Sequence, residues 1–107
     1  MANSFINKKA DLTTTDLTTL YTVPSFKTSL VKSLLVSEDA GSGTTITVTL
    51  TDSSSNVFSL FKTKSIGANG TSELLAAPLV LTAGEILKAT AATADRLHIV
   101  CSYLEIT

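Results

Sequence analysis

Cysteine and histidine are the side chains that most often supply a nucleophile or a metal ligand, and this chain has one of each, Cys101 and His98. Both fall in Leu97–Ile106, a segment with the residue pattern of a strand. A histidine without Cys or Asp partners at ligand spacing predicts a surface or interface side chain rather than a zinc ligand. The sequence places no cationic cluster and no helix N-terminus beside Cys101, so we expect a buried and unreactive thiol.

The remaining polar residues do not form a recognisable catalytic set either. The serine run Ser53–Ser55 has one histidine in the chain to serve as a base, and no spacing links the two. The Gly41-Ser42-Gly43 segment lacks the third glycine and the following helix of a dinucleotide loop, which favours a hairpin turn. Five aspartates are scattered among predicted turns, which Asp often caps: Asp11, Asp16, Asp39, Asp52 and Asp95. We therefore predict that the protein is not an enzyme and binds no cofactor and no metal ion.

Length and composition restrict the other classes of function. The chain has 107 residues, which suits one domain, and its charged share of 16% is low against the roughly 25% of an ordinary soluble domain. The formal net charge is −1 without a basic stripe, so nucleic acid is not an expected partner. The apolar runs fall far short of the ~20 residues that cross a bilayer, so no membrane partner is expected.

Short strands separated by turn residues account for most of the sequence. The clearest strand is Thr44–Thr51, in which Ile46, Val48 and Leu50 alternate with threonines. Glycines and short polar residues precede and follow it, as in hairpin turns. These signals predict that Leu30–Ile66 forms a three-strand meander.

The whole chain predicts an all-β fold. Pro78 cannot donate to a strand ladder, so Glu73–Leu81 should be an edge strand or two short strands joined at a bulge. Counting all segments gives about seven or eight short strands at the spacing of an antiparallel β-sandwich. We assign residues 17–107 to this sandwich and residues 1–16 to an N-terminal arm.

Two of the predicted strands are apolar on both faces. In the last strand one face carries Leu97, Ile99, Cys101 and Tyr103, and the other carries Val100, Leu104 and Ile106. In the strand from Ser29 to Val36 one face carries Leu30, Leu34 and Val36, and the other carries Val31 and Leu35. Because a two-layer sandwich needs only one apolar face per strand, something must cover the surplus. We predict a neighbouring copy of the chain, and the alternative is that terminal segments of the same chain fold over that face.

The N-terminal segment has two interpretations. The pair Lys8-Lys9 next to Phe5 and Ile6 indicates either a solvated, mobile end or an arm that docks on a neighbouring subunit with the lysines at its rim. Four residues are our predicted protein interface: Phe5 and Ile6 on the arm, and Leu104 and Ile106 on the apolar face of the last strand.

Four short elements carry a resemblance to a known family. They are Leu20–Pro24, Ile66–Ser72, Leu81–Lys88 and Ser102–Ile106. In this order and spacing, over about residues 17–107, they resemble small structural proteins of tailed phages, especially marine and cyanobacterial phages. The resemblance implies a virion component on the head or the tail, assembled in the host cytoplasm.

Our leading hypothesis is a capsid decoration or cement protein with a jelly-roll-like sandwich. It would act as a homo-oligomer, with a trimer as one option, and bridge subunits of the major capsid protein. A tail, neck or fibre-base subunit is the alternative within the virion. A carbohydrate-binding module is the alternative of another class, which the absence of Trp and the presence of only two Tyr disfavour.

Overall fold

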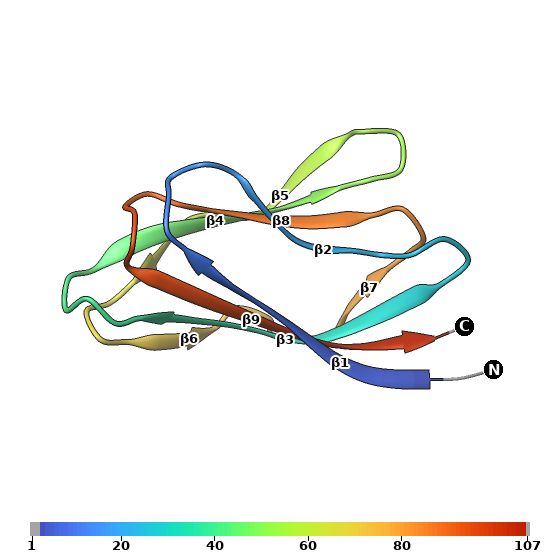
Figure 1. Cartoon of the computed structure of the whole chain (residues 1–107), viewed down its shortest axis with the longest axis horizontal. Coiled ribbons are helices and arrows are strands. Elements are labelled where there is room, and N and C mark those ends of the chain that lie inside the picture. The colour runs from blue at the N-terminus through green and yellow to red at the C-terminus, as the bar shows by residue number, and fades with distance from the viewer. Residues whose placement is uncertain (1–2, 107) are drawn as a thin grey trace.

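The computed structural model describes residues 3–106, and all its regular elements are β-strands (Figure 1). The strands are β1 (Asn3–Leu12), β2 (Thr18–Thr22), β3 (Thr28–Glu38), β4 (Thr44–Thr51), β5 (Val57–Ile66), β6 (Thr71–Glu73), β7 (Leu79–Leu81), β8 (Ile86–Ala91) and β9 (Leu97–Ile106). No described segment is a helix long and apolar enough to cross a membrane.

The strands form two antiparallel sheets that face each other. Sheet A has the order β1-β9-β3-β6, with β7 also paired to β3, and sheet B has the order β2-β8-β4-β5. This is the strand order of an eight-stranded jelly roll in which one edge strand is divided into β6 and β7. The predicted all-β, jelly-roll-like sandwich is confirmed. The predicted edge position of Glu73–Leu81 is confirmed, and two short strands are present, but the connection between β6 and β7 runs over residues 74–78 and is not a bulge.

The predicted three-strand meander over Leu30–Ile66 is wrong. Strand β3 lies in sheet A, whereas β4 and β5 pair with each other in sheet B. Alternation along a strand indicates which face is buried but does not say which sheet the strand joins. The crossing after β3 is anchored by Glu38, which is buried and accepts hydrogen bonds from the backbone amides of Ala40 and Asn69.

The core between the sheets contains the inward residues of every long strand. In β9 every second residue from Leu97 to Glu105 is buried. The alternate residues, from His98 to Ile106, are half-buried on the outer side. The predicted division of this strand into two faces is confirmed. Burial raises the pKa of Cys101 to about 12, so its thiol is unreactive at neutral pH, as expected.

Strand β3 departs from the predicted faces because it contains a β-bulge. Its pairing with β9 shifts between Val31 and Ser33, which leaves Lys32 without an opposite residue. The extra residue reverses the alternation, since side chains switch faces at every step along a strand. Val31 therefore lies inside with Leu34. Leu30 lies outside, although regular alternation had grouped it with Leu34 on one face.

The carboxylate of Glu73 on β6 holds this bulge in place. It accepts hydrogen bonds from the Ser33 hydroxyl and from the backbone amides of Leu34 and Leu75, the last two at 2.8 and 3.3 Å. Burial alone would raise the pKa of Glu73, but these hydrogen bonds outweigh it and lower the pKa. The ionised form is therefore the form that the fold stabilises.

We expect Glu73 to make stability depend on acid pH. A carboxyl group whose pKa is lower in the folded state stabilises above its unfolded pKa, here about 4.5, and this contribution is lost as pH falls through the folded pKa. Chemical denaturation of wild-type protein between pH 7 and about pH 3 should show this loss, and Glu73→Gln should show a smaller one. The control is Asp16→Asn at an exposed position of the β1–β2 loop, and Glu73→Gln should change the slope more than this control does. Equal slopes for Glu73→Gln and wild type would contradict the assignment.

Candidate functional site

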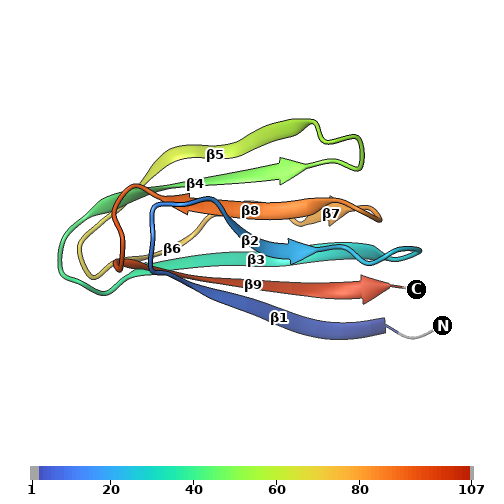
Figure 2. The same ribbon diagram turned by 45° about the horizontal axis from the view of Figure 1, so that its top comes forward.

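The described part of the N-terminal segment is an edge strand of the sandwich. Residues Asn3 to Leu12 form β1, which pairs with β9 along its whole length, from Asn3 opposite Ile106 to Leu12 opposite Leu97. Strand β1 thus extends sheet A at its edge and does not fold over the outer face of β9 (Figure 2). The apolar surplus on that face stays uncovered by the described residues.

The four residues predicted as an interface do not all share one face. Ile6 is half-buried and packs against the core, so it points inward. Phe5, its neighbour, is 77% exposed on the outer face of sheet A. Leu104 and Ile106 are half-buried on the same outer face, because the residue between them, Glu105, is buried. The structure therefore brings together three of the four.

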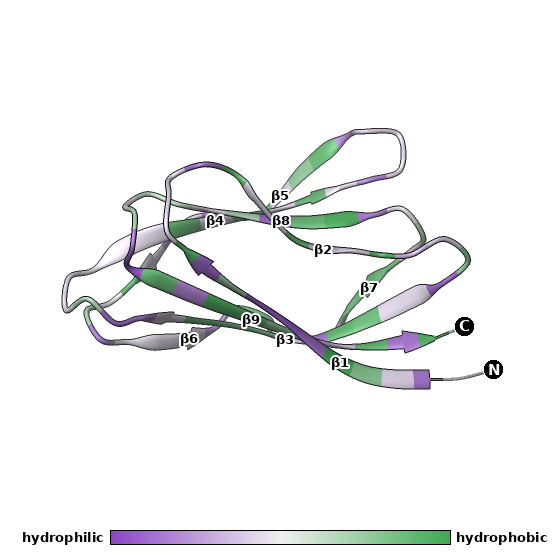
Figure 3. Ribbon diagram, viewed as in Figure 1, coloured by the Kyte–Doolittle hydropathy of each residue, from purple (hydrophilic) through white to green (hydrophobic). Residues whose placement is uncertain are grey.

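Strand register extends this cluster across sheet A. Phe5 is opposite Leu104, Leu104 is opposite Leu30, and Leu30 is opposite Val80. Directly opposite residues of antiparallel strands share a face, with Cβ atoms about 4.5–5.5 Å apart. We call Phe5, Leu104, Leu30 and Val80 the apolar row. Figure 3 shows hydrophobic segments of β1, β3 and β9 near the end of sheet A where β1 begins and β9 ends.

A shallow hollow borders the apolar row. It has a volume of about 230 Å³ and its lining includes Asn7, Ser102 and Lys32, with Phe5 at its rim. Asn7 and Ser102 are opposite each other in the register, so small polar residues form its floor. Lys32 is the bulge residue of β3, and it lines the hollow together with Asn7 and Ser102.

A buried polar network holds the strands beneath the apolar row. The Tyr21 hydroxyl of β2 donates to the Glu105 carboxylate at 2.8 Å and also hydrogen-bonds Ser29 of β3. The Tyr21 ring stacks on Tyr103 at a centroid distance of 4.0 Å. Burial raises the pKa of Tyr21 far above its usual value, so the phenol remains a donor. These contacts join Tyr21 of sheet B to Ser29 and Glu105 of sheet A. Ser29 and Glu105 are the chain neighbours of Leu30 and Leu104, so the network holds the backbone of the apolar row in position.

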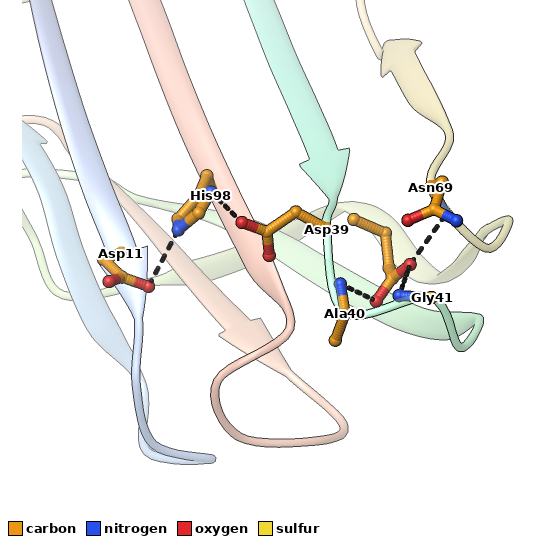
Figure 4. A network of polar contacts seen from close by, with 7 residues as sticks. Asp11, Asp39, Ala40, Gly41, Asn69 and His98 are labelled. Atoms are coloured by element: carbon orange, nitrogen blue, oxygen red, sulfur yellow. Dashed lines mark hydrogen bonds and ion pairs between the residues drawn. The ribbon is translucent and has the colours of Figure 1, made fainter.

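His98 lies on the surface, as predicted, at the opposite end of sheet A (Figure 4). Its Nε2 is 3.3 Å from Asp11 Oδ1 of β1, and its Nδ1 is 3.5 Å from Asp39 Oδ2 just after β3. The contacts tie three neighbouring segments together. Among residues 3–106, no three His, Cys, Asp or Glu side chains lie close enough to hold a metal ion.

Three apolar positions outside the core were not identified from the sequence as surface residues. Val80 joins the apolar row only because β7 pairs with β3, and no local pattern reveals that pairing. Leu30, which is half-buried, was grouped on one face with Leu34 because the bulge was not foreseen. Phe26 is 98% exposed in the β2–β3 turn at a φ of 66°, a conformation that is unusual for a bulky residue. Pro24, which cannot donate to a strand ladder, follows β2 and lies at the start of this turn.

The fold resembles that of known capsid chains. A chain in the acid-stable capsid structure of Helicobacter pylori bacteriophage KHP30 superimposes with a TM-score of 0.61 and 11% sequence identity, covering 100% of this chain and 94% of that chain. A pentameric capsid protein isolated from metagenomic phage sequences gives a TM-score of 0.44 with 18% identity and covers 92% of this chain. This chain spans 58% of that second protein.

The likeness lies in the fold. No protein-family description and no curated protein matches the sequence. The KHP30 likeness runs over nearly the full length of both chains, so the two share an architecture at low sequence identity. The KHP30 chain comes from a phage capsid. An origin in marine or cyanobacterial phages stays a prediction.

Proposed function

We propose that the protein is a structural component of a phage virion and that it decorates and cements the capsid. The observation that carries this proposal is the uncovered apolar row on a jelly roll whose full length resembles a phage capsid chain. Exposed apolar patches of this kind mark protein interaction surfaces. The low charged share of the chain, 16%, also suits a protein that is covered by neighbours in an assembly.

The apolar row is the proposed contact with the major capsid protein. Phe5 and Val80 supply exposed apolar side chains at its two ends, and Leu104 and Leu30 form its centre. Aromatic side chains surrounded by smaller contacts commonly dominate binding energy at such surfaces. Lys32 at the neighbouring hollow would meet a carboxylate or carbonyl of the partner at the rim.

The action of the protein would be mechanical. A ligand that binds only the closed shell stabilises it by mass action, and each added copy opposes local opening. A standard interface of about 800 Å² per partner is enough for stable attachment. This function needs a rigid surface and no reacting group.

Particles with and without the protein test the proposal. Capsids stripped of the protein should rupture at a lower temperature than decorated capsids, and adding purified protein back should restore the difference. Gel quantification against the major capsid protein should give hundreds of copies per particle. Equal rupture temperatures would exclude cementing, and a count of only a few copies would indicate a tail, neck or fibre-base subunit instead.

A further inference from the structure

His98 lies between two carboxylates at the end of sheet A where β1 ends and β9 begins (Figure 4). Its Nε2 is 3.3 Å from Asp11 Oδ1, and its Nδ1 is 3.5 Å from Asp39 Oδ2. Strand register explains this arrangement. His98 of β9 is opposite Asp11 of β1 on one side and opposite Ser37 of β3 on the other, and Asp39 follows the last residue of β3. Both ring nitrogens therefore face a carboxylate oxygen at the same time.

The number of protons on the imidazole ring decides how many of these contacts attract. A neutral imidazole has one N–H group and one bare nitrogen, whereas an imidazolium has an N–H group on each nitrogen and a positive charge. A bare nitrogen presents its lone pair to a carboxylate, so the neutral ring attracts only one of the two aspartates. The charged ring attracts both. The arrangement around His98 is therefore complete only in the imidazolium form.

The other charged side chains around His98 do not replace it in these contacts. They are Lys9 of β1, Glu38 of β3, and Asp95 and Arg96 of the turn before β9. Within residues 3–106, neither cation lies at ion-pair distance from Asp11 or Asp39. The carboxylate of Glu38 is buried and accepts hydrogen bonds from backbone amides instead. In this part of the chain His98 is thus the cation that contacts both aspartates.

We propose that His98 is a proton-dependent clamp on the edge strand β1. The imidazolium form holds β1 and the segment after β3 to the strand between them, and loss of one proton releases one of the two contacts. Histidine is the side chain that gains or loses a proton between about pH 5 and 8, so the clamp responds in that range. It tightens in mild acid, whereas the contribution of Glu73 is lost only below about pH 4.5.

The clamp holds a strand that has a single neighbour. Among the described strands, β1 pairs only with β9, so a contact that also reaches the segment after β3 adds a second attachment. The inference goes beyond the proposed function and does not depend on it, because the clamp belongs to the free chain. The purified protein alone is thus sufficient for the test.

Two substitutions at position 98 test the clamp by denaturant unfolding at about pH 5.5 and about pH 8.5. His98→Gln is uncharged at both pH values, and His98→Lys is charged at both. At the lower pH the unfolding equilibrium constant of wild type should be about two- to fourfold smaller than that of His98→Gln, as for two exposed ion pairs. At the higher pH most of this difference should vanish, whereas His98→Lys should differ from His98→Gln equally at both. A wild-type advantage over His98→Gln that is the same at both pH values would overturn the proposal.

Removal of one aspartate tests whether two carboxylates are needed. In an Asp39→Asn background the ring faces a single carboxylate, which a neutral imidazole can satisfy, so the pH dependence of the difference between His98 and His98→Gln should shrink. The matched control is Asp95→Asn, an exposed position in the turn before β9, which should leave the pH dependence intact. Asparagine accepts the φ of 62° at this position as aspartate does, so the control should fold normally. Equal pH dependence in the Asp39→Asn and Asp95→Asn backgrounds would refute the clamp.

Discussion

Replacement of Leu34 by alanine should lower the free energy of unfolding by about 3 kcal/mol, which for a domain of this size means a fall of roughly 12–24 °C in Tm. Leu34 is fully buried between the two sheets, and the truncated side chain would leave a cavity that rigid strands cannot fill. Thermal and denaturant unfolding of the two proteins measure the loss.

Leu35 is the matched control, since it is the same residue type one position further along. It is 40% exposed on the outer face of sheet A, so Leu35→Ala should lower the free energy of unfolding by less than about 1 kcal/mol.

The bulge in β3 allows a second comparison of two variants. Val31→Ala should destabilise more than Leu30→Ala, although leucine is larger, because the bulge turns Val31 inward. The reverse order would mean that β3 alternates regularly and that the bulge is absent.

The double variant Phe5→Lys with Val80→Lys should weaken attachment to capsids by about thirtyfold or more, which corresponds to about 2 kcal/mol. Both side chains are largely exposed at the ends of the apolar row, so the substitutions remove apolar contacts without disturbing the core. Binding of purified variants to stripped particles gives the change in affinity. The Tm of the free variant should stay near that of wild type.

A control of equal added charge separates contact from general electrostatics. Thr19→Lys with Thr22→Lys places two lysines at exposed positions of β2, on the outer face of sheet B. This variant should bind particles like wild type. If both double variants bind equally well, the apolar row is not the attachment surface, and the contact with the capsid must lie elsewhere.

The sequence predicts the strand content of this fold well because alternation is a local property. The threonine alternation in Thr44–Thr51 corresponds to β4, and Pro78 marks the division between β6 and β7. Sheet membership depends on contacts between distant segments, which is why β3 and β4 were wrongly placed in one meander. The bulge at Lys32 is held by Glu73, 41 positions away, and no pattern around Lys32 announces it.

The candidate surface was predictable only in part for the same reason. Phe5, Leu104 and Ile106 were identifiable as surplus apolar residues, but their grouping required the pairing of β1 with β9. Ile6 was assigned to the same contact as Phe5, and strand alternation puts it on the opposite face. Val80 was missed because its membership of the row depends on a three-residue strand.

The pairing of Asn3 with Ile106 has a practical consequence for the assays described above. Asn3 at the start of β1 and Ile106 at the end of β9 lie side by side at one end of sheet A (Figure 1), and they are two residues from Phe5 and from Leu104, respectively. A purification tag fused to either end would therefore stand next to the surface under study and mask it. An epitope inserted into the turn at residues 92–96, where β9 begins at the far end of the same sheet, would leave that surface unobstructed.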